Sequence, residues 1–200
     1  MSPDVGPAAA LAEEVERIGR LHEKAVVRTV ARGAVPSSVG RVFRPGTKDA
    51  LVESLPTLRI RELVELRDAS AYRAWFVRAL DLVADTALKL NPKRLNDRIH
   101  PGYKWGHSSK VLSLFVRDLL LFSRFLPAEE AGRLEPWLYC PVDGIVIDRM
   151  RRLGFDPGVR FIREIDEENF WTIQARLGDG AASTGIARVW FDDIWSEARG

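Results

Sequence analysis

Two residues of this 200-residue chain have the types and settings that nucleophilic chemistry needs, Lys110 and Asp143. Lys110 is predicted in the first turn of an apolar helix capped by Ser108, where the positive end of the helix dipole disfavours an ammonium. A lysine held partly as the free amine can attack carbon. Asp143 is predicted as the N-cap of a later helix, where its carboxylate could face a cationic sugar or Schiff-base intermediate.

The spacing between these two residues permits contact. A helix of about 17 residues carries the chain roughly 25 Å away from Lys110 at 1.5 Å per residue. The remaining stretch to Asp143 can extend roughly 50 Å at about 3.3 Å per residue, so the chain can return. We therefore expect Asp143 to lie beside Lys110.

The elements that must position this pair are predicted to be helices. The segment KVLSLFVRDLLLFSRFL, which starts at Lys110, is apolar on nearly every side, as a helix is when its neighbours cover it all round. Apolar spacings of three and four, with caps and breakers, predict further helices over 8–32, 71–90, 144–153 and from Ser183 or Thr184 onward. Residues 164–173 are less regular and form either a short helix or a brief extended piece. The fold class is therefore all-α, a compact multi-helix domain over residues 1–200 around a buried central helix.

Composition limits the class of protein. Hydrophobic residues make up 46% of the chain and charged residues 29%, which excludes extensive disorder. No apolar run reaches the roughly 18 residues of a membrane span, and the start of the chain does not resemble a secretory signal. One cysteine, Cys140, and three histidines make a metal centre improbable, so we expect no metal and no cofactor in a cytoplasmic protein.

Basic residues cluster just before the predicted central helix. Between Leu88 and Lys110 the chain has six lysines or arginines and two histidines against the single acid Asp97. The segment NPKRLNDRIHPGYKWGHSSK also contains helix breakers, which indicate a tight connection between two helices. A basic run is more often a solvated face, but the position of this one around a glycine-containing connection favours contact with a phosphate backbone.

At these residues the sequence resembles the helix-hairpin-helix DNA glycosylase superfamily, especially its 8-oxoguanine branch. There, a glycine-containing hairpin leads into a helix bearing a catalytic lysine, and an aspartate follows in a Pro-Val-Asp motif. Here HPGYKWGHSSK precedes VLSLFVRDLL, and CPVDGIVID supplies Pro141, Val142 and Asp143. The 33-residue gap is similar to that of the archaeal 8-oxoguanine glycosylases and of short bacterial proteins found among anti-phage genes. The resemblance covers about residues 70–155, although Gly102 and Gly106 are separated by three residues where the family has one.

The resemblance implies a glycine-containing helix-hairpin-helix element and a DNA base-excision N-glycosylase, with or without AP-lyase activity, that removes a damaged purine such as 8-oxoguanine. Lys110 would form the Schiff base and Asp143 would stabilise positive charge. DNA, as damaged duplex or single strand, is the expected partner, and no protein partner is implied. The expected nucleic-acid-binding residues are Lys93, Arg94, Arg98, Gly102, Lys104, Gly106, His107 and Ser108. The expected base-pocket residues are Trp105, Trp171 and Trp195.

Other interpretations stay open. Lys110 could be a surface lysine near a helix end, and Asp143 an ordinary cap. The chain could be a non-catalytic helix-hairpin-helix module that binds nucleic acid, or a glycosylase-like enzyme that acts on nucleotides or RNA in an anti-phage system. The tryptophans are more often core residues than pocket walls, and His107 is more often structural than catalytic.

Overall fold

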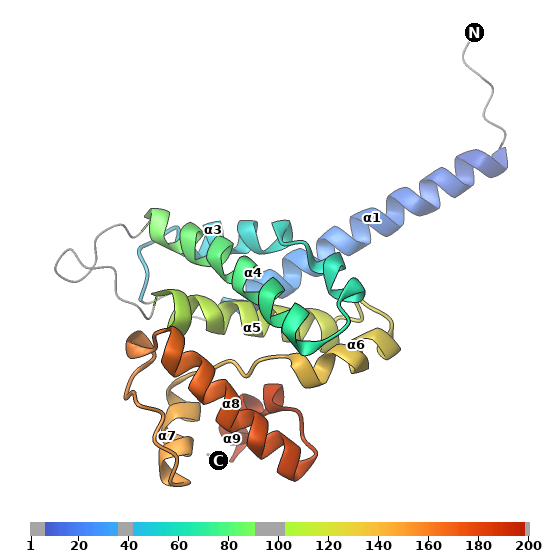
Figure 1. Cartoon of the computed structure of the whole chain (residues 1–200). Helices are drawn as coiled ribbons and strands as arrows, with labels where there is room; N and C mark the ends of the chain where they lie inside the picture. Colours follow the sequence, from blue (N-terminus) through green and yellow to red (C-terminus); the bar gives the residue numbers. More distant parts are fainter. Residues whose placement is uncertain (1–6, 36–41, 91–102, 199–200) are drawn as a thin grey trace.

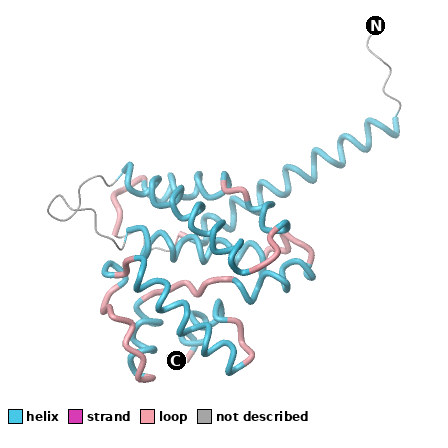
Figure 2. The backbone as a smooth tube through the Cα atoms, viewed as in Figure 1, coloured by secondary structure: helices cyan, strands magenta, loops and turns pink. Residues whose placement is uncertain are grey.

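The structure, a computed structural model, describes residues 7–35, 42–90 and 103–198, and of residues 7–10 the backbone only. These residues are mostly helical and contain no strand, which confirms the all-α class (Figure 2). The α-helices are α1 (Pro7–Ala34), α3 (Thr47–Ser54), α4 (Ala69–Leu90), α5 (Ser109–Arg117), α6 (Ala128–Leu134), α7 (Gly144–Arg152), α8 (Glu167–Thr184) and α9 (Phe191–Glu197). The 3₁₀ turns are Leu55–Thr57, Ile60–Glu65, Glu135–Trp137, Ile162–Glu164 and Arg188–Trp190, and the π-helical turns are Lys104–Ser108 and Asp118–Phe122.

The central helix is α5. Every one of its nine residues is buried, including the polar residues Ser109, Ser113 and Arg117. Helices α1 and α4 pack against it, and α3 packs against both of them (Figure 1). The segment from α7 to α9 lies on the other side of α5 in the same view. The mainly apolar helix α5 therefore forms the middle of the fold, as expected for a helix that neighbours cover on all sides, although it also buries Lys110 and Arg117.

The central helix begins earlier than predicted. The π-helical turn Lys104–Ser108 runs directly into α5, and Ser109 Oγ donates hydrogen bonds back to the carbonyls of Trp105 and Gly106. The prediction that Ser108 caps this helix is wrong, because Ser108 has helical dihedral angles and makes no cap hydrogen bond. Lys110 consequently lies more than one turn inside the helix, where the effect of the helix dipole has largely faded.

The last third of the chain also differs from prediction. Helix α8 runs from Glu167 to Thr184 and ends at Gly185, which adopts a left-handed φ of 71°. Gly178 and Gly180 lie inside α8, where Gly180 faces the ring of Phe191. A terminal helix starting at Ser183 or Thr184 is therefore wrong, because these residues form the end of α8.

The segment between α4 and α5 lies partly outside the described residues, which include neither Gly102 nor the basic residues before it. The helix-hairpin-helix element is thus not confirmed. In the described part, Gly106 packs so closely on the turn Ile162–Glu164 that an added Cβ would lie 2.1 Å from the Ile162 carbonyl oxygen. Only glycine fits at this position without a shift of the backbone.

Candidate functional site

Lys110 and Asp143 meet in the interior of the fold. Lys110 Nζ lies 3.0 Å from Asp143 Oδ2, and the two side chains are 10% and 15% exposed. A charged pair at this depth is held in place by its surroundings more firmly than a surface pair, and its electrostatic interaction is less screened by water. The structure therefore brings together the two residues for which a chemical role was predicted.

Helix α5 carries a second buried cation on the same face as Lys110. Arg117 follows seven residues later, almost two full turns, so that both side chains point in a similar direction. Arg117 Nη1 donates to Asp193 Oδ2 at 2.9 Å, and its Nε donates to Asp118 Oδ1 at 2.8 Å. Lys110 thus contacts the start of α7 while Arg117 contacts α9, and two ion pairs join the central helix to the C-terminal helices.

Asp143 uses its two carboxylate oxygens differently. Oδ1 accepts hydrogen bonds from the backbone N–H groups of Ile145 at 2.7 Å and Val146 at 3.0 Å, which makes Asp143 the N-cap of α7. The predicted cap is therefore confirmed. Oδ2 faces Lys110. The cap fixes the carboxylate plane, so its second oxygen is oriented toward the amine independently of that amine.

An extended segment leads to this cap, and a side chain on α8 holds it by its backbone. Gln174, which is buried, accepts from the Cys140 N–H at 3.0 Å and donates to the Cys140 carbonyl at 2.8 Å. Arg188 donates to the carbonyls of Leu138 at 3.0 Å and Trp137 at 2.9 Å. These four hydrogen bonds satisfy backbone groups that have no helical partner.

A further acidic residue, Asp192, belongs to the same site and was missed in the sequence. It is 8% exposed and its Oδ1 has no hydrogen-bond partner among the described residues. Burial raises the pKa of Asp192 to about 6, with the negative charge of Asp143 adding to the rise and the positive charge of Lys110 opposing it. No sequence pattern indicates that Asp192 is buried beside Asp143, because an acid in the first turn of a helix is ordinary.

The predicted nucleic-acid-binding residues fall into two groups. Lys93, Arg94, Arg98 and Gly102 lie outside the described residues. Of the others, Lys104 is one-third exposed and pairs with Asp81 at 2.5 Å. Gly106, His107 and Ser108 are buried in the π-helical turn. In the described part of this set, therefore, only Lys104 has a substantially exposed side chain.

Two of the three predicted pocket tryptophans lie together. The rings of Trp105 and Trp171 are 5.6 Å apart and meet at 65°, and the guanidinium of Arg73 lies 3.9 Å from the centre of the Trp171 ring. Trp105 is buried, whereas Trp171 is half-buried. Trp195 is elsewhere, stacked on Phe191 with ring centres 5.2 Å apart. The structure does not bring it to the other two.

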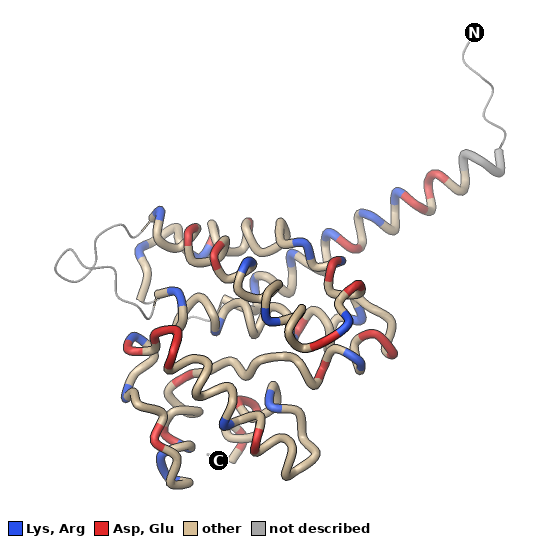
Figure 3. Tube along the Cα trace, viewed as in Figure 1, with Lys and Arg blue, Asp and Glu red and all other residues tan. Residues whose placement is uncertain are grey.

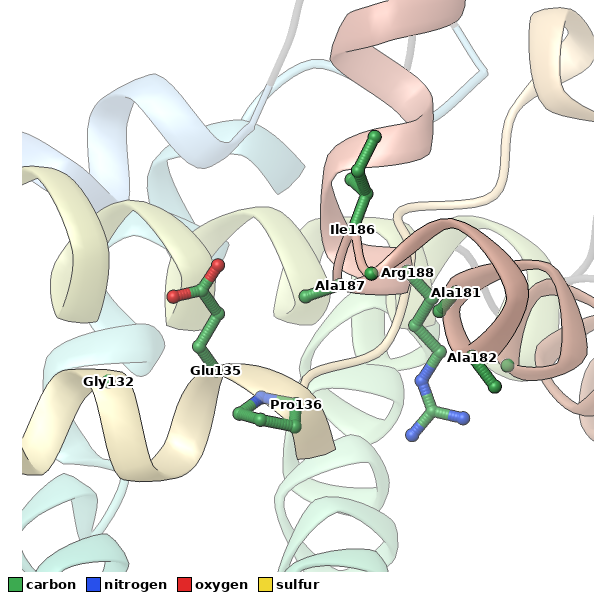
Figure 4. A pocket seen from close by; sticks show the side chains of 10 residues that line it. Gly132, Glu135, Pro136, Ala181, Ala182, Ile186, Ala187 and Arg188 are labelled. Atoms are coloured by element: carbon green, nitrogen blue, oxygen red, sulfur yellow. The ribbon is translucent and has the colours of Figure 1, made fainter.

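Four cavities among the described residues lie away from the ion pair, since neither Lys110 nor Asp143 lines any of these four. One of about 550 Å³ lies between the end of α6 and the end of α8, with Glu135 and Arg188 on its walls (Figure 4). Another of about 380 Å³ lies between α7, α8 and α9 and has a largely apolar wall that includes Phe155 and Trp195.

The described residues offer little support for metal-dependent or thiol chemistry. They contain no group of three His, Cys, Asp or Glu side chains that could hold a metal ion. Cys140 is fully buried, and burial raises the pKa of its thiol well above the ordinary value, so that a reactive thiolate is disfavoured. Within the described ranges there is also no helix with the length and apolar character needed to cross a membrane.

Comparisons of the chain with protein-family models, with curated proteins and with solved structures found no match. The chemical interpretation of the site therefore depends on its own geometry and on the motif resemblance.

Proposed function

We propose that this protein is a DNA base-excision N-glycosylase that uses Lys110 as its nucleophile and has AP-lyase activity. The observation that carries the proposal is the 3.0 Å contact between Lys110 Nζ and an Asp143 carboxylate oriented by its own helix. A nucleophile within hydrogen-bond reach of a fixed base is the arrangement that covalent catalysis by an amine requires. The proposal includes a helix-hairpin-helix element that joins α4 to α5 and binds the DNA backbone.

The proposed reaction uses both residues. Asp143 takes a proton from the Lys110 ammonium, and the free amine attacks C1′ of a nucleotide that has been flipped out of the stack. The Nζ–C1′ bond forms as the bond from C1′ to the base breaks, and the electron pair leaves with the base, which takes up a proton. Nζ then gives up one proton, and its electron pair forms a double bond to C1′ as the C1′–O4′ bond breaks. O4′ takes up a proton, and a protonated imine remains on Lys110.

The substrate class of the proposal is a damaged purine such as 8-oxoguanine, as the motif resemblance implies. An extruded base needs an aromatic surface to replace the stacking that it loses. Trp171 offers such a surface, because it is half-buried and its ring lies against Trp105, which belongs to the turn before Lys110. Trp195 is less suited, since it stacks on Phe191 in a separate cavity.

The test is trapping with borohydride, which reduces the imine and fixes the protein to DNA covalently. We expect an adduct between the wild-type protein and a duplex containing 8-oxoguanine or another damaged purine, and none with Lys110→Gln. Lys48→Gln, at an exposed lysine on α3, is the matched control and should retain the adduct. Absence of an adduct across a panel of lesions, or one that survives Lys110→Gln, would rule out this mechanism.

A second candidate is a nucleic-acid-binding module without chemistry. It is favoured by one observation, that Lys110 is engaged by Asp143 and lines none of the four cavities formed by described residues. In that case Lys110 and Asp143 form a structural ion pair. Salt-dependent DNA binding with no base release, and with weaker binding in Lys104→Gln, would support this alternative.

A third candidate is the same chemistry on RNA or free nucleotides in an anti-phage system. Mass spectrometry of the bases released from DNA, RNA and nucleotide pools separates it from the first candidate. Release from RNA or nucleotides alone, lost in Lys110→Gln, would favour it.

A further inference from the structure

The N-terminal half of α1 projects from the body of the molecule (Figure 1). Its apolar side chains are mostly exposed, at 66% for Leu11, 62% for Val15, 54% for Ile18 and 52% for Leu21. Burial in α1 starts only near Val27, from where the helix packs on the rest of the fold. The first half of α1 thus has an apolar face that nothing in the described structure covers.

A helix of this kind is poorly stable alone. Helical segments shorter than about 12–15 residues are marginal in water even with good helix formers, and this segment contains Gly19, which lowers helix stability further. Leu11, Val15 and Ile18 are spaced by four and three residues, which places them in one row along the helix. Covering this row with a second helix would bury it and stabilise the segment.

The charges along the segment identify what covers it. The acidic residues Glu13, Glu14 and Glu16 come first, and the basic residues Arg17, Arg20 and Lys24 follow, as the colours along α1 show (Figure 3). Within one chain Glu14 pairs with Arg17 and Glu16 with Arg20 on the exposed helix surface, and the one acid among the later residues, Glu23, pairs with Arg61 at 2.5 Å. Exposed pairs of this kind are weak, so the charges remain able to face a second helix. A helix with this charge order is complementary to a copy of itself that runs in the opposite direction, because each acidic end then faces a basic end.

We propose that the free half of α1 pairs with the same segment of a second copy of this chain, antiparallel, about a point between Glu16 and Arg17. In this arrangement Val15 packs against the second copy's Ile18, and Ile18 against its Val15. Glu14 flanks the apolar row and comes close to the second copy's Arg17. A parallel arrangement would place acid beside acid and would also bring both molecular bodies to the same end.

The overlap from Leu11 to His22 is 12 residues, about 18 Å of helix. A contact of this length is small among protein interfaces, so the association is weak and depends on protein concentration. The bodies lie at opposite ends of the helix pair. The pairing is independent of the proposed glycosylase activity, since Lys110 and Asp143 lie in the body.

Sedimentation velocity over a wide concentration range tests the pairing. We expect the wild-type chain to self-associate as concentration rises, and Val15→Glu combined with Ile18→Glu to remain monomeric at every concentration. Leu153→Glu is the matched control, because Leu153 is equally exposed at 55% but lies after α7. A wild-type chain that is monomeric throughout, or association unchanged by the double substitution, would overturn the proposal.

Charge reversal tests the antiparallel direction. Glu14→Arg and Arg17→Glu should each weaken self-association, because each places like charges side by side. The chain carrying both reversals, and an equal mixture of the two single variants, should associate as the wild type does, since opposite charges again face each other. Failure of both to restore association would contradict the antiparallel arrangement.

Discussion

At the scale of single residues, Asp143 serves both the fold and the proposed chemistry. Its Oδ1 caps α7 and its Oδ2 faces Lys110, so replacing it affects both functions at once. Asparagine caps a helix about as well as aspartate, whereas alanine does not. Neither replacement keeps the negative charge that faces Lys110. The two substitutions therefore separate the cap from the charge.

We predict that Asp143→Ala is less stable to urea than Asp143→Asn by about 1 kcal/mol, the usual worth of an N-cap. Both variants should lose borohydride trapping, because both lose the carboxylate. The control is the same pair of substitutions at Asp68, which caps an exposed helix start: its Oδ1 accepts from the Ala71 N–H at 2.8 Å. Equal stability of Asp143→Ala and Asp143→Asn would mean that the cap contributes nothing.

Asp192 predicts a pH dependence of stability. Burial raises the pKa of Asp192 from 3.8 to about 6 in the folded chain, so between these values the folded state holds a proton that the unfolded state has lost. The unfolding free energy therefore falls as pH rises from about 4 to about 6, by at most about 3 kcal/mol, and this contribution is constant at higher pH. Asp192→Asn stays uncharged, so its stability relative to wild type should rise between about pH 4 and about pH 6 and then stay constant up to pH 8 in urea titrations. A difference between the two proteins that does not change with pH would show that Asp192 does not titrate in this range.

At the scale of elements, the approach of the π-helical turn Lys104–Ser108 to the turn Ile162–Glu164 depends on Gly106. This contact connects the beginning of the central helix to the segment before α8. The motif resemblance implied that Gly106 belongs to a DNA-binding hairpin. The structure gives this glycine a packing role that no local pattern reveals, since its contact is 56 residues away in the chain.

Gly106→Ala should destabilise the fold by about 2 kcal/mol or more, because a Cβ 2.1 Å from a backbone oxygen forces the two turns apart. Gly132→Ala is the matched control, for it lies in α6 with open space around an added Cβ. That control should be neutral or stabilising by up to about 1 kcal/mol, as expected for alanine in a helix. Thermal unfolding of the two variants checks the difference, and equal stabilities would contradict the close packing.

At the scale of the whole molecule, prediction succeeded where sequence patterns are local. The cap Asp143 and the buried central helix could be predicted because each depends on residues close in the chain. The contact of Lys110 with Asp143 could be expected only from the motif resemblance and the chain's reach. Two features could not be predicted, the continuation of α8 through Gly180 and the burial of Asp192 near Asp143 and Lys110. Both depend on contacts between segments that are distant in the chain.

The exposed half of α1 predicts uneven protection from hydrogen exchange. In dilute protein the amides from Leu11 to His22 should exchange rapidly, because no tertiary contact supports their hydrogen bonds, while those of α5 should exchange slowest. Raising the concentration should slow exchange in this segment alone, since pairing with a second copy stabilises it. Exchange measured by mass spectrometry at two concentrations checks this, with α3 as an internal reference. Protection independent of concentration would contradict the expectation.

The grip of Gln174 on Cys140 has a consequence for which substitutions the chain tolerates. The side-chain amide of Gln174 bonds the N–H and the carbonyl of one residue, as the edge of a neighbouring strand would in a sheet. Gln174 contacts only backbone atoms of residue 140 through these two hydrogen bonds. The position of the Asp143 cap therefore does not depend on which small side chain residue 140 carries. Substitution of Gln174 is therefore not tolerated, because no other residue type of similar size can both donate and accept these two hydrogen bonds. Substitution of Cys140 by another small residue is tolerated.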